Sequence, residues 1–404
     1  MKSSLIILLA FVTHTIDPNL QTLLTRPVDD GTFEISFDEL SHDPHFYTYT
    51  VTHLNANLEP SDLMSSEYLE GFTTADITDY DHSLNTNVLY THYRFFFPND
   101  EMKITLPGLY ALSIYEDGDP DNVVAVAVVP VVNSPSDAPS AITGNVTSHT
   151  QKEFNGRYQQ LDLELKIDPS TRSEDYFIVV RQNDRYDNLV YAPQPTYREP
   201  GRLRWVNCRN LIFEGGNEYR HFDIYSTYYA GVGVDKVRYG QGDYYVTLDF
   251  DEMRNRGVYT HQYDVNGGRV INAERCSDPD YEAEYMYVHF EYPVPLNSKL
   301  SNTLNSQLST LNLYIGGSLF YNRLTNENRL LYDPEIECYW LDALVKQGGT
   351  DYQFWVYSPE SGVTVEPTEG SYWQTENDYS VYVYYRPFGS RSDALIGIYH
   401  VSSR

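Results

Sequence analysis

Basic residues and long apolar runs are both scarce in this sequence of 404 residues. Lys and Arg number 28 against 57 Asp and Glu, which gives a formal net charge of −29. A chain this acidic is repelled by phosphate backbones and anionic lipid heads, so we expect no nucleic-acid partner. After the first 15 residues, no segment approaches the ~20 apolar residues that a membrane-spanning helix needs. We therefore expect no membrane span and a soluble mature chain.

Cysteine is also rare, with only Cys208, Cys276 and Cys338. Three cysteines allow at most one disulfide and leave one thiol over, which excludes a disulfide framework. None lies near the N-terminus, so no cysteine is available for lipid attachment there. Scattered cysteines of this kind are most often buried core residues.

The common catalytic signatures are missing as well. The sequence has no Gly-x-Ser-x-Gly elbow, no phosphate loop and no His-Glu-x-x-His pair. The acidic run at 117–122 lacks the glycine and the glutamate that a calcium loop needs, and His42 and His45 have no further ligand nearby in sequence. We predict a non-enzymatic protein with no cofactor and no metal site.

The first 15 residues are typical of a secretory signal peptide. Lys2 precedes the apolar run 5–12, and a polar stretch follows it. We predict cleavage near Thr15 and export of the remaining chain. The alternative is a hydrophobic first strand of a cytosolic protein.

Strand patterns dominate the rest of the chain. Apolar residues alternate with polar ones at 32–38 and again at 161–167, as expected for antiparallel strands with one buried face and one exposed face. Tyrosine, with 38 residues, suits such half-buried surfaces. The sequence therefore predicts an all-β protein.

Two linker-like stretches, at 133–140 and 295–310, are rich in Ser, Asn or Pro and divide the chain. We predict three consecutive β-sandwich domains of immunoglobulin-like or E-set-like type. The predicted segments are a signal peptide at 1–15, an N-terminal sandwich at 20–133, a middle sandwich at 146–294 and a C-terminal E-set-like sandwich at 309–404.

An ordered series of short motifs extends along the whole chain after the signal peptide. The series contains SFDEL at 36–40, HLNANL at 53–58, SLNT at 83–86, YTHY at 90–93, QNDRYDN at 182–188, FEGGNEYRHFDI at 213–224, LVKQG at 344–348, TENDY at 375–379 and DALIG at 393–397. In this series the chain resembles the type IX secretion system plug family. Leu54 and Leu58 depart from the family pattern of Cys and Trp, but as apolar residues they would still fill a core.

The resemblance marks a set of motif positions that we interpret as structural or partner-contacting. They are Asn85, Thr86, Tyr90, Gln182, Asn183, Arg185, Asn217, Glu218, Arg220, Phe222, Asp223, Lys346, Gln347, Gly348, Glu376 and Asn377. Within this set, Glu218, Arg220 and Asp223 alternate with aromatic residues, which suggests a paired network that fixes a strand crossing. The other reading makes Arg220 a contact to the partner.

The resemblance implies a periplasmic protein at the inner face of the outer membrane. Its partner would be the outer-membrane translocon barrel of the type IX secretion system, whose periplasmic opening it would block when idle. The alternative is a carbohydrate-binding or surface-glycan β-sandwich protein. The ring pairs at 339–340, 354–355 and 372–373 would then serve as stacking platforms, although core packing explains them equally well.

Overall fold

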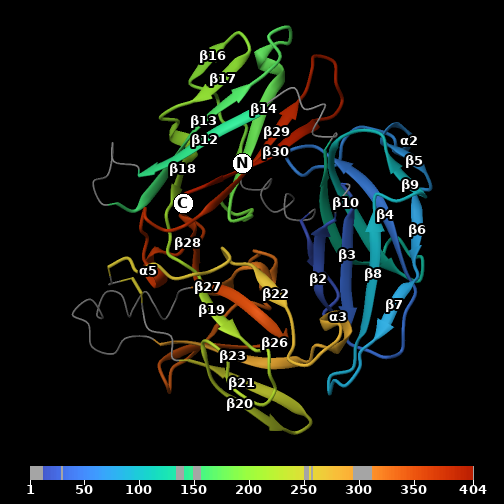
Figure 1. Cartoon of the computed structure of the whole chain (residues 1–404), viewed down its shortest axis with the longest axis vertical. Coiled ribbons are helices and arrows are strands. Elements are labelled where there is room, and N and C mark those ends of the chain that lie inside the picture. Colours follow the sequence, from blue (N-terminus) through green and yellow to red (C-terminus); the bar gives the residue numbers. More distant parts are fainter. Residues whose placement is uncertain are drawn as a thin grey trace.

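Strands dominate the computed structural model, which describes residues 12–28, 31–132, 141–148, 156–249, 254–255, 258–293 and 312–403 (Figure 1). The helices are single turns: α2 (Ser65–Tyr68), α3 (Pro279–Glu282), α5 (Glu366–Glu369) and the 3-10 turns η2 (Ser173–Asp175), η3 (Arg209–Leu211) and η4 (Ser318–Phe320). No helix in these ranges is long and apolar enough to cross a membrane. The predicted all-β fold is confirmed.

The first part of the chain forms the N-terminal sandwich, drawn in blue to blue-green in Figure 1. One sheet has the order β1-β11-β10-β4-β6, the other β2-β3-β8-β7, and β5 pairs with β9. The strands are β1 (His14–Thr15), β2 (Leu20–Pro27), β3 (Phe33–Glu39), β4 (Tyr47–Leu54), β5 (Leu69–Gly71), β6 (Thr74–Ile77), β7 (Asp79–His82), β8 (Thr91–Phe97), β9 (Met102–Ile104), β10 (Gly108–Glu116) and β11 (Val123–Val131).

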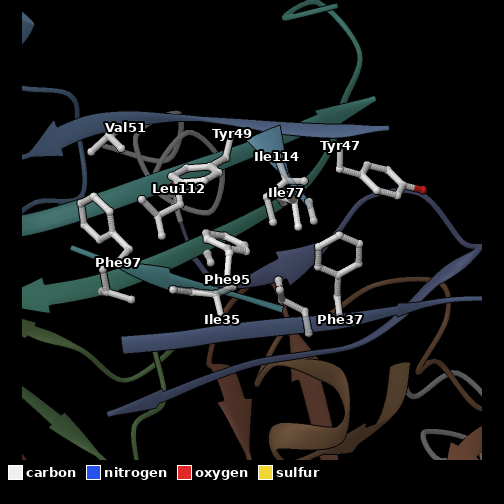
Figure 2. Close-up of a cluster of buried hydrophobic side chains, with 14 of the residues drawn as sticks. Ile35, Phe37, Tyr47, Tyr49, Val51, Ile77, Phe95, Phe97, Leu112 and Ile114 are labelled. Atoms are coloured by element: carbon white, nitrogen blue, oxygen red, sulfur yellow. The ribbon is translucent and has the colours of Figure 1, made fainter. Parts of the chain in front are cut away.

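The core of this sandwich is packed between its two sheets (Figure 2). Ile35 and Phe37 on β3 are fully buried, as their alternation predicts, and Phe37 meets Tyr47 on β4 edge-on with ring centroids 5.3 Å apart. The other face of β3 was expected to be exposed, and that prediction is wrong. Asp38 on that face is fully buried, because a side chain from a later part of the chain covers it.

A second pair of sheets, the split sandwich, combines the middle of the chain with its C-terminal strands. Its sheets have the orders β12-β13-β17-β16, with β18 also on β13, and β15-β14-β29-β30. The strands are β12 (Ala141–Ser148), β13 (Tyr158–Lys166), β14 (Tyr176–Gln182), β15 (Val190–Tyr191), β16 (Tyr197–Glu199), β17 (Arg202–Trp205), β18 (Ile212–Glu214), β29 (Asp378–Tyr385) and β30 (Ala394–Ser402). The alternation predicted at 161–167 is confirmed, since its leucines are buried and Lys166 is exposed.

The described residues between β18 and β29 form the inserted sandwich. One sheet has the order β20-β21-β23-β26-β25, and the other is built around β27 with β19, β22, β24 and β28. The strands are β19 (Arg220–Asp223), β20 (Val234–Gly240), β21 (Asp243–Leu248), β22 (Arg269–Ile271), β23 (Tyr285–Pro293), β24 (Asn312–Gly316), β25 (Leu331–Asp333), β26 (Cys338–Lys346), β27 (Gly348–Ser358) and β28 (Gly362–Thr364).

The predicted boundaries after the first sandwich need correction. β14, assigned to the segment 146–294, pairs with β29 from the segment 309–404, with Val180 opposite Val381. β23 and β26, also from different predicted segments, are neighbours in the inserted sandwich. In Figure 1 the red C-terminal strands accordingly lie beside the green ones. Alternation identifies the buried face of a strand, but it does not identify the partner strand.

Several predicted features fall partly outside the described residues. The linkers at 133–140 and 295–310 lie outside them, as does the predicted signal peptide up to residue 11. His14 and Thr15 form β1, which pairs with β11, so the predicted cleavage point near Thr15 falls at the end of a strand of the folded sheet. The three cysteines form no disulfide; Cys338 is buried and the other two are half-buried.

An apolar cluster joins the N-terminal sandwich to the split sandwich. Leu54 and Leu58 pack there with Val179 and Tyr384, and all four are nearly inaccessible to solvent. The prediction that Leu54 and Leu58 would fill a core is confirmed. The core they fill lies between two sandwiches, so these residues also fix how the two are oriented.

Candidate functional site

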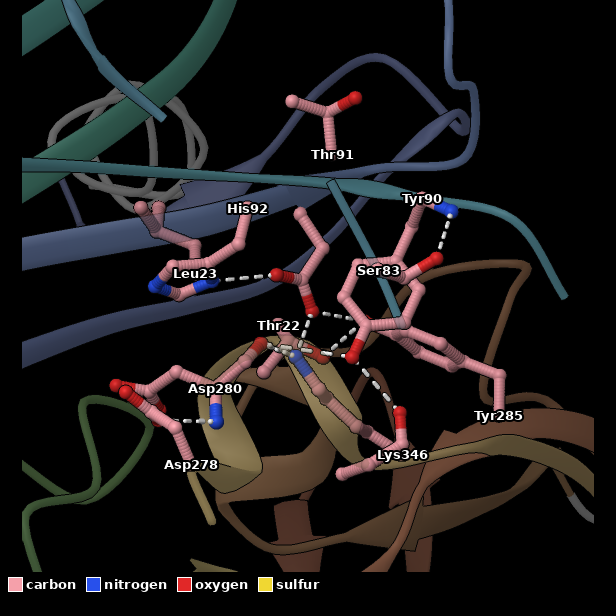
Figure 3. A network of polar contacts seen from close by, with 12 residues as sticks. Thr22, Leu23, Ser83, Tyr90, Thr91, His92, Asp278, Asp280, Tyr285 and Lys346 are labelled. Carbon is pink, nitrogen blue, oxygen red and sulfur yellow. Dashed lines mark hydrogen bonds and ion pairs between the residues drawn. The ribbon is translucent and has the colours of Figure 1, made fainter. Parts of the chain in front are cut away.

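A buried lysine joins the N-terminal sandwich to the inserted sandwich (Figure 3). Lys346 ends β26, and its side chain is only 1% exposed. Its Nζ lies 2.6 Å from Oδ2 of Asp38 on β3 and 4.3 Å from the ring centroid of Tyr90. The Tyr285 hydroxyl donates to Asp38 Oδ2 at 2.6 Å, and Nδ1 of His92 lies 2.7 Å from Oδ1. We call Asp38, Tyr90, His92, Tyr285 and Lys346 the lysine junction.

The lysine junction balances two buried charges. Burial acts to raise the pKa of Asp38, but the charge of Lys346 and the hydrogen bond from His92 outweigh it and hold that pKa below its usual range. Burial also lowers the pKa of Lys346, against the opposing effect of Asp38. Each group therefore depends on the other, because the loss of either would leave the remaining one as a buried charge without its ion-pair partner.

The motif positions predicted in these regions gather around this junction. The two residues that follow Thr86 donate their backbone N–H groups to the carboxylate of Glu284 on the inserted sandwich, at 2.5 and 3.1 Å. Gln347 accepts the N–H of Glu284 at 2.9 Å, and Asn85 has a φ of 61° in the loop that makes the contact. Gly348 has a φ of 150°, and a Cβ there would lie 1.9 Å from a backbone carbonyl oxygen, which only glycine avoids.

A second group of motif residues joins the split sandwich to the inserted one without charge. Asn183 donates to Asn377 Oδ1 at 2.8 Å, and Asn377 donates to Gln159 Oε1 at 3.0 Å. Gln182 donates to the last carbonyl of β18 at 3.0 Å, and Asn217 donates to the last carbonyl of α5 at 2.8 Å. We call Gln159, Gln182, Asn183, Asn217 and Asn377 the amide junction.

The predicted network of Glu218, Arg220 and Asp223 is wrong. Arg220 binds Glu369 of α5, with Nη2 3.0 Å from Oε2, and both side chains are buried. Along β19 the side chains alternate, so Arg220 and Phe222 face inward while Asp223 faces the other way and contacts the neighbouring histidine ring at 2.9 Å. Arg220 therefore has an intramolecular partner, and that partner lies 149 residues away in the sequence.

The remaining predicted residues also have intramolecular partners. Glu218 accepts the hydroxyl of Tyr259 at 2.5 Å and the N–H of Glu376 at 3.2 Å, and burial raises its pKa. Arg185 donates to Asp187 at 3.0 and 2.6 Å. Its guanidinium also lies over the ring of Trp355, 4.3 Å from the centroid.

The rings proposed as sugar-stacking platforms are mostly internal. Trp355 and Phe354 are fully buried and Tyr339 nearly so, which leaves them no face for a ligand. Trp373 is 42% exposed, and Trp340 is half-buried and stacks on His289. Within the described residues, no group of three or more His, Cys, Asp or Glu side chains is placed to hold a metal ion.

Sequence reasoning missed the partners that complete these junctions. Asp38 lies in the SFDEL motif at 36–40, but the predicted set of structural or partner-contacting residues does not include it. The set also lacks Tyr285 and Glu369. A weak signal for a buried polar site exists at 36–38. There Ser36 and Asp38 lie on one face of a strand whose other face is apolar. Nothing local indicates that another part of the chain covers that face.

Comparisons with known proteins add evidence that is independent of these contacts. A family model described as the first domain of the type 9 secretion system plug protein matches residues 16–133, the N-terminal sandwich. The crystal structure of a hypothetical protein from Parabacteroides merdae ATCC 43184 has a TM-score of 0.89 and 32% sequence identity to this chain, covering 97% of this chain and 99% of that one. A search of the curated proteins finds no match.

Proposed function

Because this chain belongs to the type IX secretion system plug family, we propose that it closes the periplasmic opening of the translocon barrel when no substrate is exported. An idle pore wide enough for protein cargo would leak, so a protein that fills its mouth maintains the permeability barrier. The match of the family model to the N-terminal sandwich is the observation that carries this proposal.

Rigidity supports the same role. The N-terminal sandwich is attached to the inserted sandwich by the lysine junction and to the split sandwich by the apolar cluster around Leu54 and Leu58. A preformed body loses little conformational entropy on binding, so more of its contact energy remains for holding the pore closed. The proposed plug works as one body and includes no catalytic step.

The surface has features that suit a protein partner. Phe46, Tyr228, Tyr263 and Phe388 are each more than four-fifths exposed, and rigid aromatic side chains are common at protein interfaces. The net charge of −29 favours a partner rim that is less acidic or basic. If rim charges steer docking, association weakens as salt rises.

The proposed location is the periplasm, at the inner face of the outer membrane. The family supports a place in the cell envelope. The predicted signal peptide is the route by which the chain would reach it. Fractionation of cells with a tagged copy would then recover the protein with the outer membrane at low salt and in the soluble periplasmic fraction at high salt.

Deletion strains test the function directly. Deleting this protein alone is expected to make the outer membrane permeable to large antibiotics or dyes, while deleting the translocon as well restores the barrier. The tagged protein is expected to co-purify with the translocon from detergent-solubilised outer membranes at low salt. Equal permeability in the single and double deletions, or no co-purification, would contradict the proposal.

A further inference from the structure

A cavity of about 280 Å³ lies beside the amide junction. Four parts of the chain enclose it: the loop between β14 and β15, β18 with its connection to β19, the β27–β28 hairpin, and Asn377 before β29. Ligand pockets for drug-sized molecules span roughly 300–1,000 Å³. This cavity is slightly smaller and suits a correspondingly small molecule.

The walls of the cavity are polar although they are deeply buried. Gln182, Asn217, Gln353 and Asn377 line it, and their exposed fractions are 3, 6, 2 and 3%. Their amide groups are held by hydrogen bonds within the protein, such as that from Gln353 to the Asn217 carbonyl at 2.6 Å. The cavity is therefore a preformed polar frame.

Two polar atoms of lining residues make no well-formed hydrogen bond within the protein. They are the hydroxyl oxygen of Tyr219 and the side-chain oxygen of Asn188. Tyr219 is 2% exposed, and burial raises its pKa to about 12, so the hydroxyl stays protonated and can donate. Buried polar groups normally have partners, so an unpartnered donor and an unpartnered acceptor at one cavity point to a ligand that supplies both.

The charges around the cavity exclude an anionic ligand. Arg185 is the cation among the lining residues, and Asp187 neutralises it through two hydrogen bonds. Glu214 also lines the cavity, and burial raises its pKa. With the arginine already paired and a further carboxyl group present, a phosphate or carboxylate would find no excess positive charge. A ligand hydroxyl group can both donate and accept a hydrogen bond, so it can pair with the Tyr219 hydroxyl and with the Asn188 side-chain oxygen.

We propose that this cavity binds a neutral polyhydroxylated molecule of the size of a single sugar. The site differs from the tryptophan platforms suggested by the sequence, because it depends on Tyr219 and Asn188 and needs no exposed ring. The proposal goes beyond the plug function and does not depend on it.

Titration of the purified full-length chain tests the site. The probes are D-glucose, D-galactose, D-mannose and N-acetylglucosamine, followed by ligand-observed NMR and calorimetry, with the 6-phosphates of the first three for comparison. We expect saturable binding of at least one neutral sugar and at least tenfold weaker binding of its phosphate. No binding by any of the four neutral sugars, or tighter binding of a phosphate, overturns the proposal.

The variant Tyr219→Phe separates binding from folding. The hydroxyl makes no well-formed hydrogen bond in the protein, although the nearby Asn183 side chain favours its ionised form, so the ligand-free variant is expected to unfold close to the wild-type temperature. Sugar affinity is expected to fall about tenfold, equivalent to about 1.4 kcal/mol. Tyr239→Phe, on the exposed strand β20, is the matched control and should bind as the wild type does.

A second variant keeps the test decisive if Tyr219→Phe alters folding. Asn188→Ala removes the open acceptor and also the Nδ2 donor to Gln182 Oε1 at 2.9 Å. It should weaken sugar binding while retaining cooperative unfolding, which is measured on the same sample. Wild-type affinity in both variants would contradict the assignment. Translocon co-purification is measured separately, so a failure of sugar binding and a failure of the plug function can be distinguished.

Discussion

The lysine junction and the amide junction hold the same molecule together by different physical means. The lysine junction places a buried ammonium against a buried carboxylate, between parts of the chain that are 308 residues apart. The amide junction uses neutral groups that bind one another and the ends of strands and of α5. A charged junction fails severely when one partner is lost, whereas a neutral junction loses one bond at a time.

Lys346→Met tests the first half of this comparison and should have the largest effect. Methionine keeps much of the volume but leaves Asp38 as a buried carboxylate without its cationic partner, held only by Tyr285 and His92. We expect a loss of about 3–5 kcal/mol in the free energy of unfolding, measured by urea denaturation. Lys103→Met, at an exposed position on β9, is the control and should change stability by less than about 0.5 kcal/mol. Equal midpoints for the two variants would show that the buried pair is unimportant.

Asn377→Ala tests the neutral junction and should have a smaller effect. It removes the donor to Gln159 and the acceptor for Asn183, and leaves those amides short of partners. We expect a loss of about 2 kcal/mol, since an unsatisfied buried group costs about 1–3 kcal/mol. Asn122→Ala, in an exposed turn, should stay within about 0.5 kcal/mol of wild type. A loss as large as that of Lys346→Met would remove the distinction between the junctions.

The sequence predicted the strands and many of the residues at both junctions, but few of their partners. The buried faces of β3 and β13 follow from strict alternation, which is a local property. The pairing of β14 with β29 and the contact of Asp38 with Lys346 are not local, and no period in the sequence encodes them. Arg220 shows what the sequence does not predict. Its charge predicted an ion pair, but its partner is Glu369 and not Glu218 or Asp223, which are nearer in sequence.

Acid should affect the two junctions differently, and this is the smallest of the expected effects. The pKa of Asp38 is lower in the folded protein than in the unfolded chain, so its stabilising contribution is complete above about pH 4. As the pH falls from there toward the folded pKa, the unfolded chain binds a proton that the folded protein does not, and stability falls. Lys346 adds nothing in this window, because a lysine is protonated in both states there.

The double variant Asp38→Asn/Lys346→Met isolates this contribution, because it removes the acid and its partner together. Between about pH 4 and the folded pKa of Asp38, its stability should decline less steeply than that of wild type, by at most about 1.4 kcal/mol per pH unit, the limit for one proton. Asn377→Ala changes no titrating group, so its acid profile should run parallel to that of wild type at a lower level. Urea unfolding at a series of acid pH values measures all three. Parallel curves for wild type and the double variant would mean that the pKa of Asp38 is not lowered by folding, and the lysine junction would then lack the charge balance that distinguishes it from the amide junction.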